Sequence, residues 1–400
     1  MDIFDKYEPT IIELSNNDIK INDYDVELSN NTCFPDISYG FNHFSFKLEE
    51  NMKLLTDYYK NRQKIYYVTI PFEKTSDYKK ETNDGMKFIT IEDGINNFIK
   101  DVDKKAPKLI GRSFMKLWEL NLYFDLISKS DGFTSVHLGE NKGAFVQATI
   151  IFRDYLGKKK NEYFSTDAND KLTNYYKNIK IIKEKNVNKI KSVIDSAKTA
   201  DFITADTHYD LKRINLREQE AYNLILSEVI TALHLQKDNG NFVLRIYETY
   251  TIVTIKIIEL LKTFYDKVWI SKPLSSRSSS PEKFIICKKF NKKRLSSKIS
   301  KDLLSMIKTV DENKNFNIIN ILKNNDLSDK IINFYKKINV DLFVKQYVGM
   351  NNISGFIMLE NHNGVEYNKY LDAQINASHL WINLFLAPDL FKQINKYAMK

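Results

Sequence analysis

Two glycines stand four residues apart in VHLGENKGAF (136–145), in a chain with only 12 glycines among 400 residues. An apolar run precedes Gly139, and a run typical of a helix follows Gly143. Such a pair at a strand-to-helix turn lets a ligand approach the backbone closely. Glu140 stands where the strand ends and can accept hydrogen bonds from a ligand amine or hydroxyl. The GxGxxG and Walker A patterns are absent, so a simple strand–helix loop is the alternative.

Charged residues in or after apolar runs are the next candidates. Arg245 lies inside NFVLRIY, and a buried charge needs a partner, so it meets an anion or emerges at the end of the strand. The alternative is an edge strand that points Arg245 at water. Asp206 follows the run DFITA, where a ligand at the end of that strand would lie; a loop-capping aspartate is the alternative.

Polar and cationic side chains precede one acid in KPLSSRSSSPEKFII (272–286). Arg277 and several serines come before Glu282, which opens the last predicted strand. A surface hairpin is the alternative reading of this stretch. Lys116, in GRSFMKLWEL, belongs to an amphipathic helix, where a lysine is usually solvated. It becomes a candidate only beside the other charged residues.

These residues fall in a part of the chain where predicted strands and helices alternate. The strands are continuous apolar runs at 133–138, 162–165, 200–206, 241–247, 267–271 and 283–290, and the helices lie at 113–127, 143–156, 217–237 and 249–265. This pattern predicts an α/β fold with a parallel sheet covered by helices on both faces. Ligands of such sheets bind beyond the carboxyl ends of the strands, where the strand order reverses.

We predict three parts in the chain. Residues 1–105 form a mixed α/β N-terminal extension, with strand-like pieces at 64–70 and 86–91 and no recognisable chemistry. Residues 106–290 form the α/β domain. Residues 291–400 form a mostly helical C-terminal segment with a strongly basic beginning.

Composition restricts the class of protein. A net charge of +9 favours a polyanionic partner, although solubility alone also explains it. Two cysteines exclude a disulfide framework and a zinc site. The N-terminus has no secretory signal, and lysines interrupt the most apolar stretch, at 249–265. We expect a soluble cytoplasmic protein without a membrane partner.

Five motifs in order resemble a known family. They are GRSFMKLWEL, VHLGENKGAF, DFITAD, GNFVLRIYETYT and KPLSSRSSSPEKFIICKKF. Residues 106–290 resemble the FtsJ-like ribose 2′-O-methyltransferases, most of all the divergent members encoded by large cytoplasmic DNA viruses. The resemblance implies a Rossmann-like methyltransferase sheet whose final strand is antiparallel, and S-adenosylmethionine as cofactor without a metal. The cofactor contacts that it implies are Gly139, Glu140, Asn141, Gly143, Phe145 and Asp206.

The resemblance also implies a Lys-Asp-Lys-Glu tetrad facing a ribose 2′-hydroxyl. By motif position the tetrad falls on Lys116, Asp206, Arg245 and Glu282. Two cations and two acids in a desolvated pocket can bring the pKa of a lysine toward neutrality. Arginine stands at the third position and does not deprotonate, so Arg245 can hold the 2′-oxygen but cannot be the base.

Two more departures fall in the same motifs: Lys142 replaces the proline usual in the glycine turn, and Thr207-His208 replace small residues after the aspartate. We therefore hold two hypotheses. The first is an RNA 2′-O-methyltransferase, related to mRNA capping, with weak or lost activity and with Lys116 or a water taking the proton. The second is an inactive, methyltransferase-like RNA-binding or scaffold subunit of a capping or virion complex.

RNA, and capped mRNA in particular, is the partner that both hypotheses imply. The residues predicted to contact it are Lys272, Ser276, Arg277, Lys288 and Lys289. The basic cluster from Lys288 to Lys301 follows the strand that Glu282 opens, so we expect it to flank the active cleft; a solvated basic face is the alternative. If the protein is viral, we expect it in the cytoplasmic factory and in the virion.

Overall fold

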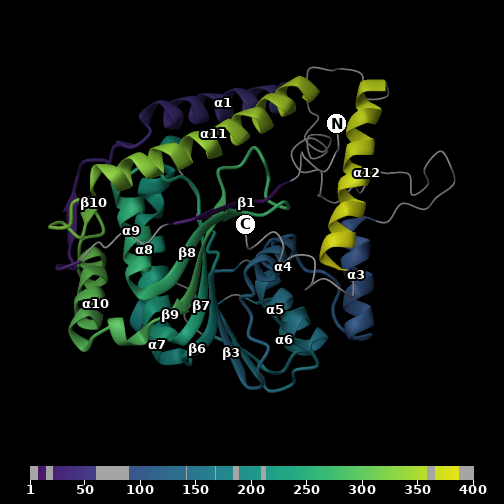
Figure 1. The fold of residues 1–400 in the computed structure, drawn as a ribbon, viewed down its shortest axis with the longest axis horizontal. Coiled ribbons are helices and arrows are strands. Elements are labelled where there is room, and N and C mark those ends of the chain that lie inside the picture. Colours follow the sequence, from purple (N-terminus) through teal and green to yellow (C-terminus); the bar gives the residue numbers. More distant parts are fainter. Residues whose placement is uncertain are drawn as a thin grey trace.

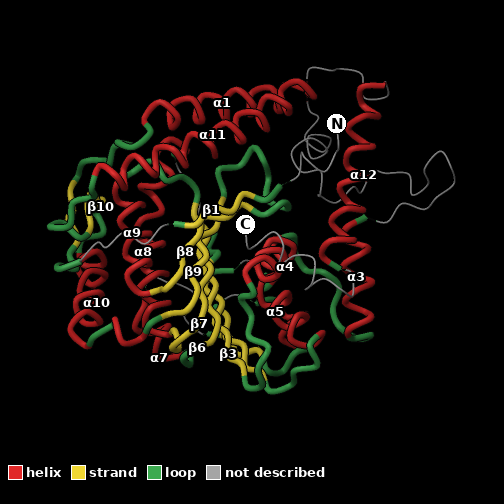
Figure 2. Tube along the Cα trace, in the orientation of Figure 1, coloured by secondary structure: helices red, strands yellow, loops and turns green. Residues whose placement is uncertain are grey.

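A computed structural model describes residues 8–14, 21–59, 90–140, 142–166, 168–182, 189–208, 213–357 and 365–386. Its centre is an eight-stranded sheet with helices on both faces (Figures 1 and 2). The strand order is β1-β8-β9-β7-β6-β3-β4-β5. The bounds are β1 (Thr10–Glu13), β3 (Phe133–Leu138), β4 (Asn161–Ser165), β5 (Ile179–Ile181), β6 (Ala200–Ala205), β7 (Gln236–Ile246), β8 (Tyr265–Lys272) and β9 (Lys283–Phe290). The predicted α/β fold class is confirmed.

The five parallel strands all end at the same edge of the sheet, which we call its carboxyl edge. Strands β5, β4, β3, β6 and β7 pair in parallel, and β9 runs antiparallel between β7 and β8. The chain continues from β3 to β4 on one side, while β6 lies on the other side of β3. The strand order therefore reverses between β3 and β6, next to the predicted glycine turn and Asp206.

Successive residues of a strand face opposite sides of the sheet. Both sets are apolar in the central strands, so the sheet is apolar on both faces. In β9, Phe284 and Ile286 belong to one buried cluster, while Ile285 and Cys287 belong to the other. The first cluster includes side chains of α3 (Ile91–Val102), α4 (Ser113–Phe124), α5 (Ala144–Tyr155), α6 (Asp170–Tyr175) and α12 (Val365–Phe385). The second includes side chains of α7 (Ile190–Ser196), α8 (Arg217–Leu235), α9 (Ile252–Phe264), α10 (Ser297–Glu312) and α11 (Asp329–Ile357).

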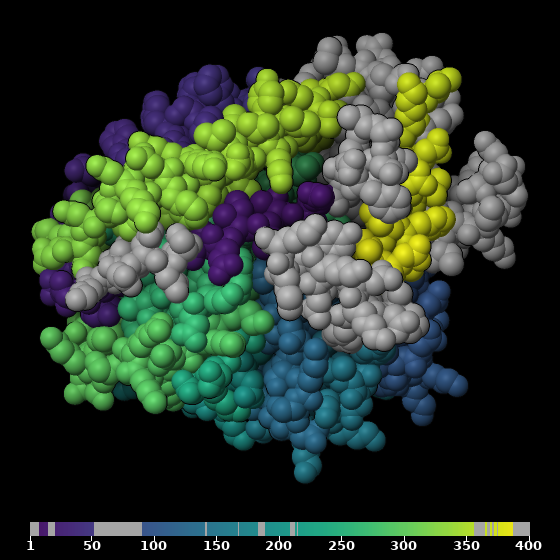
Figure 3. All heavy atoms as spheres, viewed as in Figure 1, coloured from purple at the N-terminus to yellow at the C-terminus, as the bar shows by residue number. Residues whose placement is uncertain are grey.

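Described segments from the first 60 residues pack on the C-terminal part of the chain and on the sheet. Strand β1 pairs with β8 at the sheet edge, and β2 (Val26–Ser29) pairs with β10 (Asn317–Ile321) in a second, two-stranded sheet. Helix α1 (Tyr39–Tyr59) lies along α11, and both form one layer across the top of the molecule (Figure 3). The C-terminal segment thus contains a strand that the sequence analysis missed.

The strands predicted at 64–70 and 86–91 are not found among the described residues. The stretch 64–70 lies outside the described residues, as do residues 86–89 of the stretch 86–91. Ile91, the last residue of that stretch, begins helix α3, which Thr90 caps by accepting a hydrogen bond from the Asp93 amide. The division of the chain at residues 105 and 290 remains a prediction. Among the described helices, none has both the length and the apolar character that a bilayer crossing requires.

Candidate active site

Four charged side chains from four elements meet at the carboxyl edge of the sheet. Lys116 Nζ, from α4, lies 2.6 Å from Glu282 Oε1, just before β9. Arg245 Nε, from β7, lies 2.7 Å from Asp206 Oδ1, just after β6. Arg245 Nη1 is 3.7 Å from Glu282 Oε2 and joins the two pairs. The structure thus brings together all four residues that the resemblance placed in a tetrad; their catalytic role remains a prediction.

The two carboxylates of this tetrad have different environments. Burial by itself raises the pKa of Glu282, but Lys116 and Arg245 hold that pKa well below its ordinary value. Ser276 Oγ also donates a hydrogen bond to Glu282 Oε1, at 2.7 Å. At Asp206 burial prevails over Arg245 and Lys116, and the pKa is raised. Of the two carboxyl groups, Glu282 is therefore the stronger acid, and Asp206 protonates more readily.

The guanidinium of Arg245 binds the backbone that follows β6. Its side chain is only 11% exposed, and its strand lies between β6 and β9, so the edge-strand alternative is wrong. Nη2 donates to the Thr207 carbonyl at 2.7 Å and to the Asp206 carbonyl at 3.4 Å. The planar fork thus clamps the backbone that follows β6, which a lysine ammonium cannot do in the same way.

Two of the predicted RNA contacts instead hold the loop between β8 and β9. Lys272 Nζ donates to the carbonyls of Ser280 at 2.5 Å and Glu282 at 2.9 Å. Burial lowers the pKa of Lys272 to about 7, against the opposing charge of Glu282. Ser276 binds Glu282, as described above. Both side chains therefore position the acid of the tetrad, and Arg277 remains a predicted RNA contact.

The predicted position of the basic cluster from Lys288 to Lys301 is wrong. Strand β9 begins beside Glu282 and runs antiparallel to β7, away from the tetrad. Lys289 N donates to Oδ1 of Asn241, which directly precedes the first β7 residue paired with β9. Lys288 Nζ donates to the Phe124 carbonyl at the end of α4. A strand of eight residues spans on the order of 25 Å. Lys288 and Lys289 therefore lie at the amino edge of the sheet, where the parallel strands begin, and not at the carboxyl edge with the tetrad.

The glycine turn has the expected backbone, but its own chain covers it. Gly139 and Gly143 have φ of 63° and 88°, in the left-handed region that favours glycine. A Cβ at Gly139 would lie 1.5 Å from Thr207 Oγ1 and 2.6 Å from Thr207 Cα. A Cβ at Gly143 would lie 2.7 Å from Leu172 Cδ1. Thr207 thus packs directly against Gly139, and a side chain at either glycine would collide with its neighbour.

The other residues predicted to bind the cofactor serve the turn and the core. Glu140 is completely buried, forms an isolated antiparallel bridge with Thr207, and accepts a hydrogen bond from the Val146 amide at 3.0 Å. It thereby satisfies an amide in the first turn of α5. Phe145 is also completely buried and lies against Phe284. Asn141 lies outside the described residues. All these contacts to the cofactor stay predictions.

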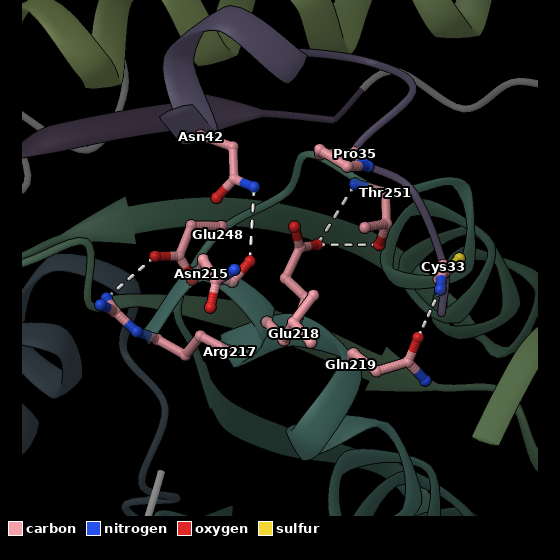
Figure 4. Close-up of a pocket in the computed structure, with 10 residues that line it drawn as sticks. Cys33, Pro35, Asn42, Asn215, Arg217, Glu218, Gln219, Glu248 and Thr251 are labelled. Carbon is pink, nitrogen blue, oxygen red and sulfur yellow. Dashed lines mark hydrogen bonds and ion pairs between the residues drawn. The ribbon is translucent and has the colours of Figure 1, made fainter. Parts of the chain in front are cut away.

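A second charged cluster lines a small cavity beneath α1 (Figure 4). Arg217 forms ion pairs with Glu248 at 2.9 Å and with Glu49 at 2.7 Å. Glu218 accepts hydrogen bonds from the amides of Tyr250 and Thr251. The cavity measures about 20 Å³, which is the size that one water needs. This cluster joins the N-terminal extension to the sheet and is too small to be a substrate site.

Residues 109–290 match the family of FtsJ-like methyltransferases. This match confirms the resemblance carried by the five motifs, over a little under half of the chain. Members of this family take the methyl group from S-adenosylmethionine, so the predicted cofactor and the predicted enzyme class, methyltransferase, are those of the family.

Three relatives match different amounts of the chain. A ribosomal RNA large subunit methyltransferase E from Methanococcus vannielii is 26% identical over 52% of this chain and 80% of its own length. An uncharacterized protein, R383, from Acanthamoeba polyphaga mimivirus is 21% identical over 90% of this chain and 83% of its own. A cap-specific mRNA (nucleoside-2′-O-)-methyltransferase 1 from Mus musculus is 28% identical over 27% of this chain and 13% of its own. Only the mimivirus protein, among these three, also matches most of the terminal segments.

Proposed function

We propose that this protein is an RNA ribose 2′-O-methyltransferase that acts on the 5′ end of capped mRNA, with slow turnover. The meeting of Lys116, Asp206, Arg245 and Glu282 at the switch point of the sheet carries this proposal. The similarity to the archaeal ribosomal RNA enzyme supports RNA as the substrate. The similarity to the mouse cap enzyme and to the mimivirus protein supports a capped viral transcript.

The chemistry required of these residues is mainly positioning. A 2′-hydroxyl is a weak nucleophile and has to be oriented toward the methyl donor and relieved of its proton. In this proposal Lys116 is the group that can orient the hydroxyl, because its side chain is 19% exposed, while Glu282 fixes its ammonium. Arg245 cannot take the proton, and Lys116 can take it only as the neutral amine, after its ammonium has given up a proton. The acceptor is therefore Lys116 in that form or a water molecule.

A specific observation favours a second function, that of an inactive subunit which binds RNA or scaffolds a capping or virion complex. Arg245 replaces the lysine of the family and clamps the Thr207 carbonyl, and Thr207 in turn covers Gly139. In this alternative the domain keeps its fold and its charge but neither holds the cofactor nor transfers a methyl group.

One assay separates the two functions. Methyl transfer from labelled S-adenosylmethionine is measured on cap-bearing RNA, uncapped RNA and a ribosomal RNA fragment, with the wild type beside Arg245→Lys. We expect slow wild-type transfer to capped RNA and a gain of about 100-fold in the variant, on the order of 2.7 kcal/mol. Transfer to ribosomal RNA alone would overturn the cap assignment. No transfer by either protein, with no cofactor binding in calorimetry, would overturn the enzyme and leave only the second function.

A further inference from the structure

The loop at residues 273–282, between β8 and β9, supplies both Glu282 and Ser276 to the tetrad. Lys272 holds this loop from inside the sheet, as described above. The loop is also held from outside, at two separate points, by the C-terminal helices α12 and α11. Both helices lie beyond residue 290, where the match to the methyltransferase family ends.

Helix α12 holds the loop through Glu119, a residue of α4 that is completely buried and lies one turn beyond Lys116. Glu119 Oε2 accepts from the Leu274 amide at 2.7 Å, and Oε1 accepts from the Ser275 amide at 2.9 Å. Trp381 of α12 donates its indole N–H to the same Oε1, at 2.9 Å. One carboxylate therefore connects the helix of Lys116, the loop of Glu282 and the C-terminal helix.

Helix α11 holds the other half of the loop by close packing. A Cβ at Gly349 would lie 2.7 Å from Ser278 Oγ and 2.9 Å from the backbone nitrogen of Ser279. A glycine inside a helix costs about 1 kcal/mol relative to alanine. The close approach of the loop gives the physical reason for glycine at this position, since any side chain would push the loop away.

We propose that the C-terminal helices are part of the active site, with Gly349 and Trp381 as positioning residues that place Glu282 through the loop 273–282. This inference rests on the proposed methyltransferase function. Glu282 touches both Lys116 and Arg245, so a displaced loop disturbs both cations at once. A misplacement of about 1 Å at a catalytic centre can cost about 100-fold in rate.

The first test compares Gly349→Ala with Gly355→Ala. Both glycines lie on α11, but a Cβ at Gly355 would meet nothing within 4 Å. We expect Gly349→Ala to lower kcat at least tenfold while the Kd for S-adenosylmethionine and the melting temperature change little. Gly355→Ala should leave all three quantities unchanged or raise the melting temperature slightly.

The second test compares Trp381→Phe with Trp118→Phe. Both tryptophans are buried and tie α12 to α4, but the indole of Trp118 donates to the Phe385 carbonyl and not to Glu119. We expect Trp381→Phe to lower kcat severalfold more than Trp118→Phe does. Equal losses of kcat in the two variants would mean that docking of α12 alone matters, and would overturn the role of Glu119 and Trp381.

Amide hydrogen exchange keeps this inference distinct from the proposed function. We expect the amides of residues 274–280 and 282 to exchange at least tenfold faster in Gly349→Ala and Trp381→Phe than in the two control variants. If the wild type transfers no methyl group but the exchange differs as expected, the proposed function fails and the positioning of the loop stands. Exchange rates and kcat that are the same in Gly349→Ala as in Gly355→Ala would overturn the inference.

Discussion

The tetrad and the glycine turn are neighbours in the fold but are organised in opposite ways. At the tetrad, alternating charges lie within ion-pair distance, and Lys116 keeps access to solvent. At the glycine turn, Thr207, the residue after Asp206, packs against Gly139 and covers it. The tetrad is thus assembled within the protein, while packing within the chain covers the glycine turn. The comparison shows that the four charged groups meet even though the chain's own residues pack over the neighbouring turn.

Arg245 links the tetrad to Thr207, which covers the glycine turn. Its Nε faces Asp206 of the tetrad, and its Nη2 holds the Thr207 carbonyl of the cover. Glu228 holds the same residue from the other side, because the Thr207 amide donates to Glu228 Oε1 at 3.2 Å. A substitution at position 245 therefore removes contacts to both the tetrad and the cover, and variants at other positions are needed to separate the two.

Removal of Lys116 should have the largest effect. Lys116→Ala deletes the most exposed cation of the tetrad, so we expect methyl transfer to capped RNA to fall about 1000-fold, within the range of positioned acid–base groups. Lys129→Ala, at an exposed ion pair with Asp125, is the control and should retain the wild-type rate. An unchanged rate in Lys116→Ala would show that the tetrad does not act in the reaction.

Glu228, which binds the Thr207 amide, should make the free energy of unfolding depend on pH. Burial raises the pKa of Glu228 from 4.5 to about 8, so the native protein binds more protons than the unfolded chain between these values. The free energy of unfolding should therefore fall as the pH rises from 4.5 to 8, by on the order of 4 kcal/mol from this group. Denaturant titrations across that range should show a smaller fall for Glu228→Gln; identical slopes would contradict the shift.

Opening the cover should strengthen cofactor binding moderately. Thr207→Gly removes the side chain that lies against Gly139, so we expect the Kd for S-adenosylmethionine to fall about tenfold, or about 1.4 kcal/mol. Thr207→Ser keeps the hydroxyl and the backbone position and should bind like the wild type. Calorimetry measures both variants. Equal affinities in all three proteins would show that Thr207 does not obstruct the site.

The smallest expected effect is on RNA affinity. It should distinguish the carboxyl edge of the sheet, with the tetrad, from the opposite edge, with Lys289. Arg277 lies in the loop of the tetrad, so Arg277→Ala should weaken RNA binding severalfold and reduce the salt dependence of log Kd by about one unit. Lys289→Ala, at the far end of β9, should leave RNA affinity unchanged within about twofold. A salt titration of both variants checks this order. The reverse result would place the RNA surface at the opposite edge.

Local patterns were sufficient to predict most of the elements around the site. The runs 133–138 and 283–290 coincide with β3 and β9, and the predicted helices at 113–127 and 143–156 contain α4 and α5. These predictions succeeded because burial on both faces leaves a continuous apolar run, which can be read residue by residue. β10 was missed because NIINI, five residues inside a polar, mostly helical segment, carries little periodic signal.

The sequence by itself determined which residue types are available for chemistry: the motif order, two glycines at a turn, and an arginine where the family has lysine. Only the tertiary structure decided where those residues point. The antiparallel course of β9 moved Lys288 away from the tetrad, Thr207 covered Gly139, and Trp381 joined Glu119 across 262 residues of chain. Contacts of this kind depend on strand direction and on packing between distant segments, and local periodicity contains no information about either.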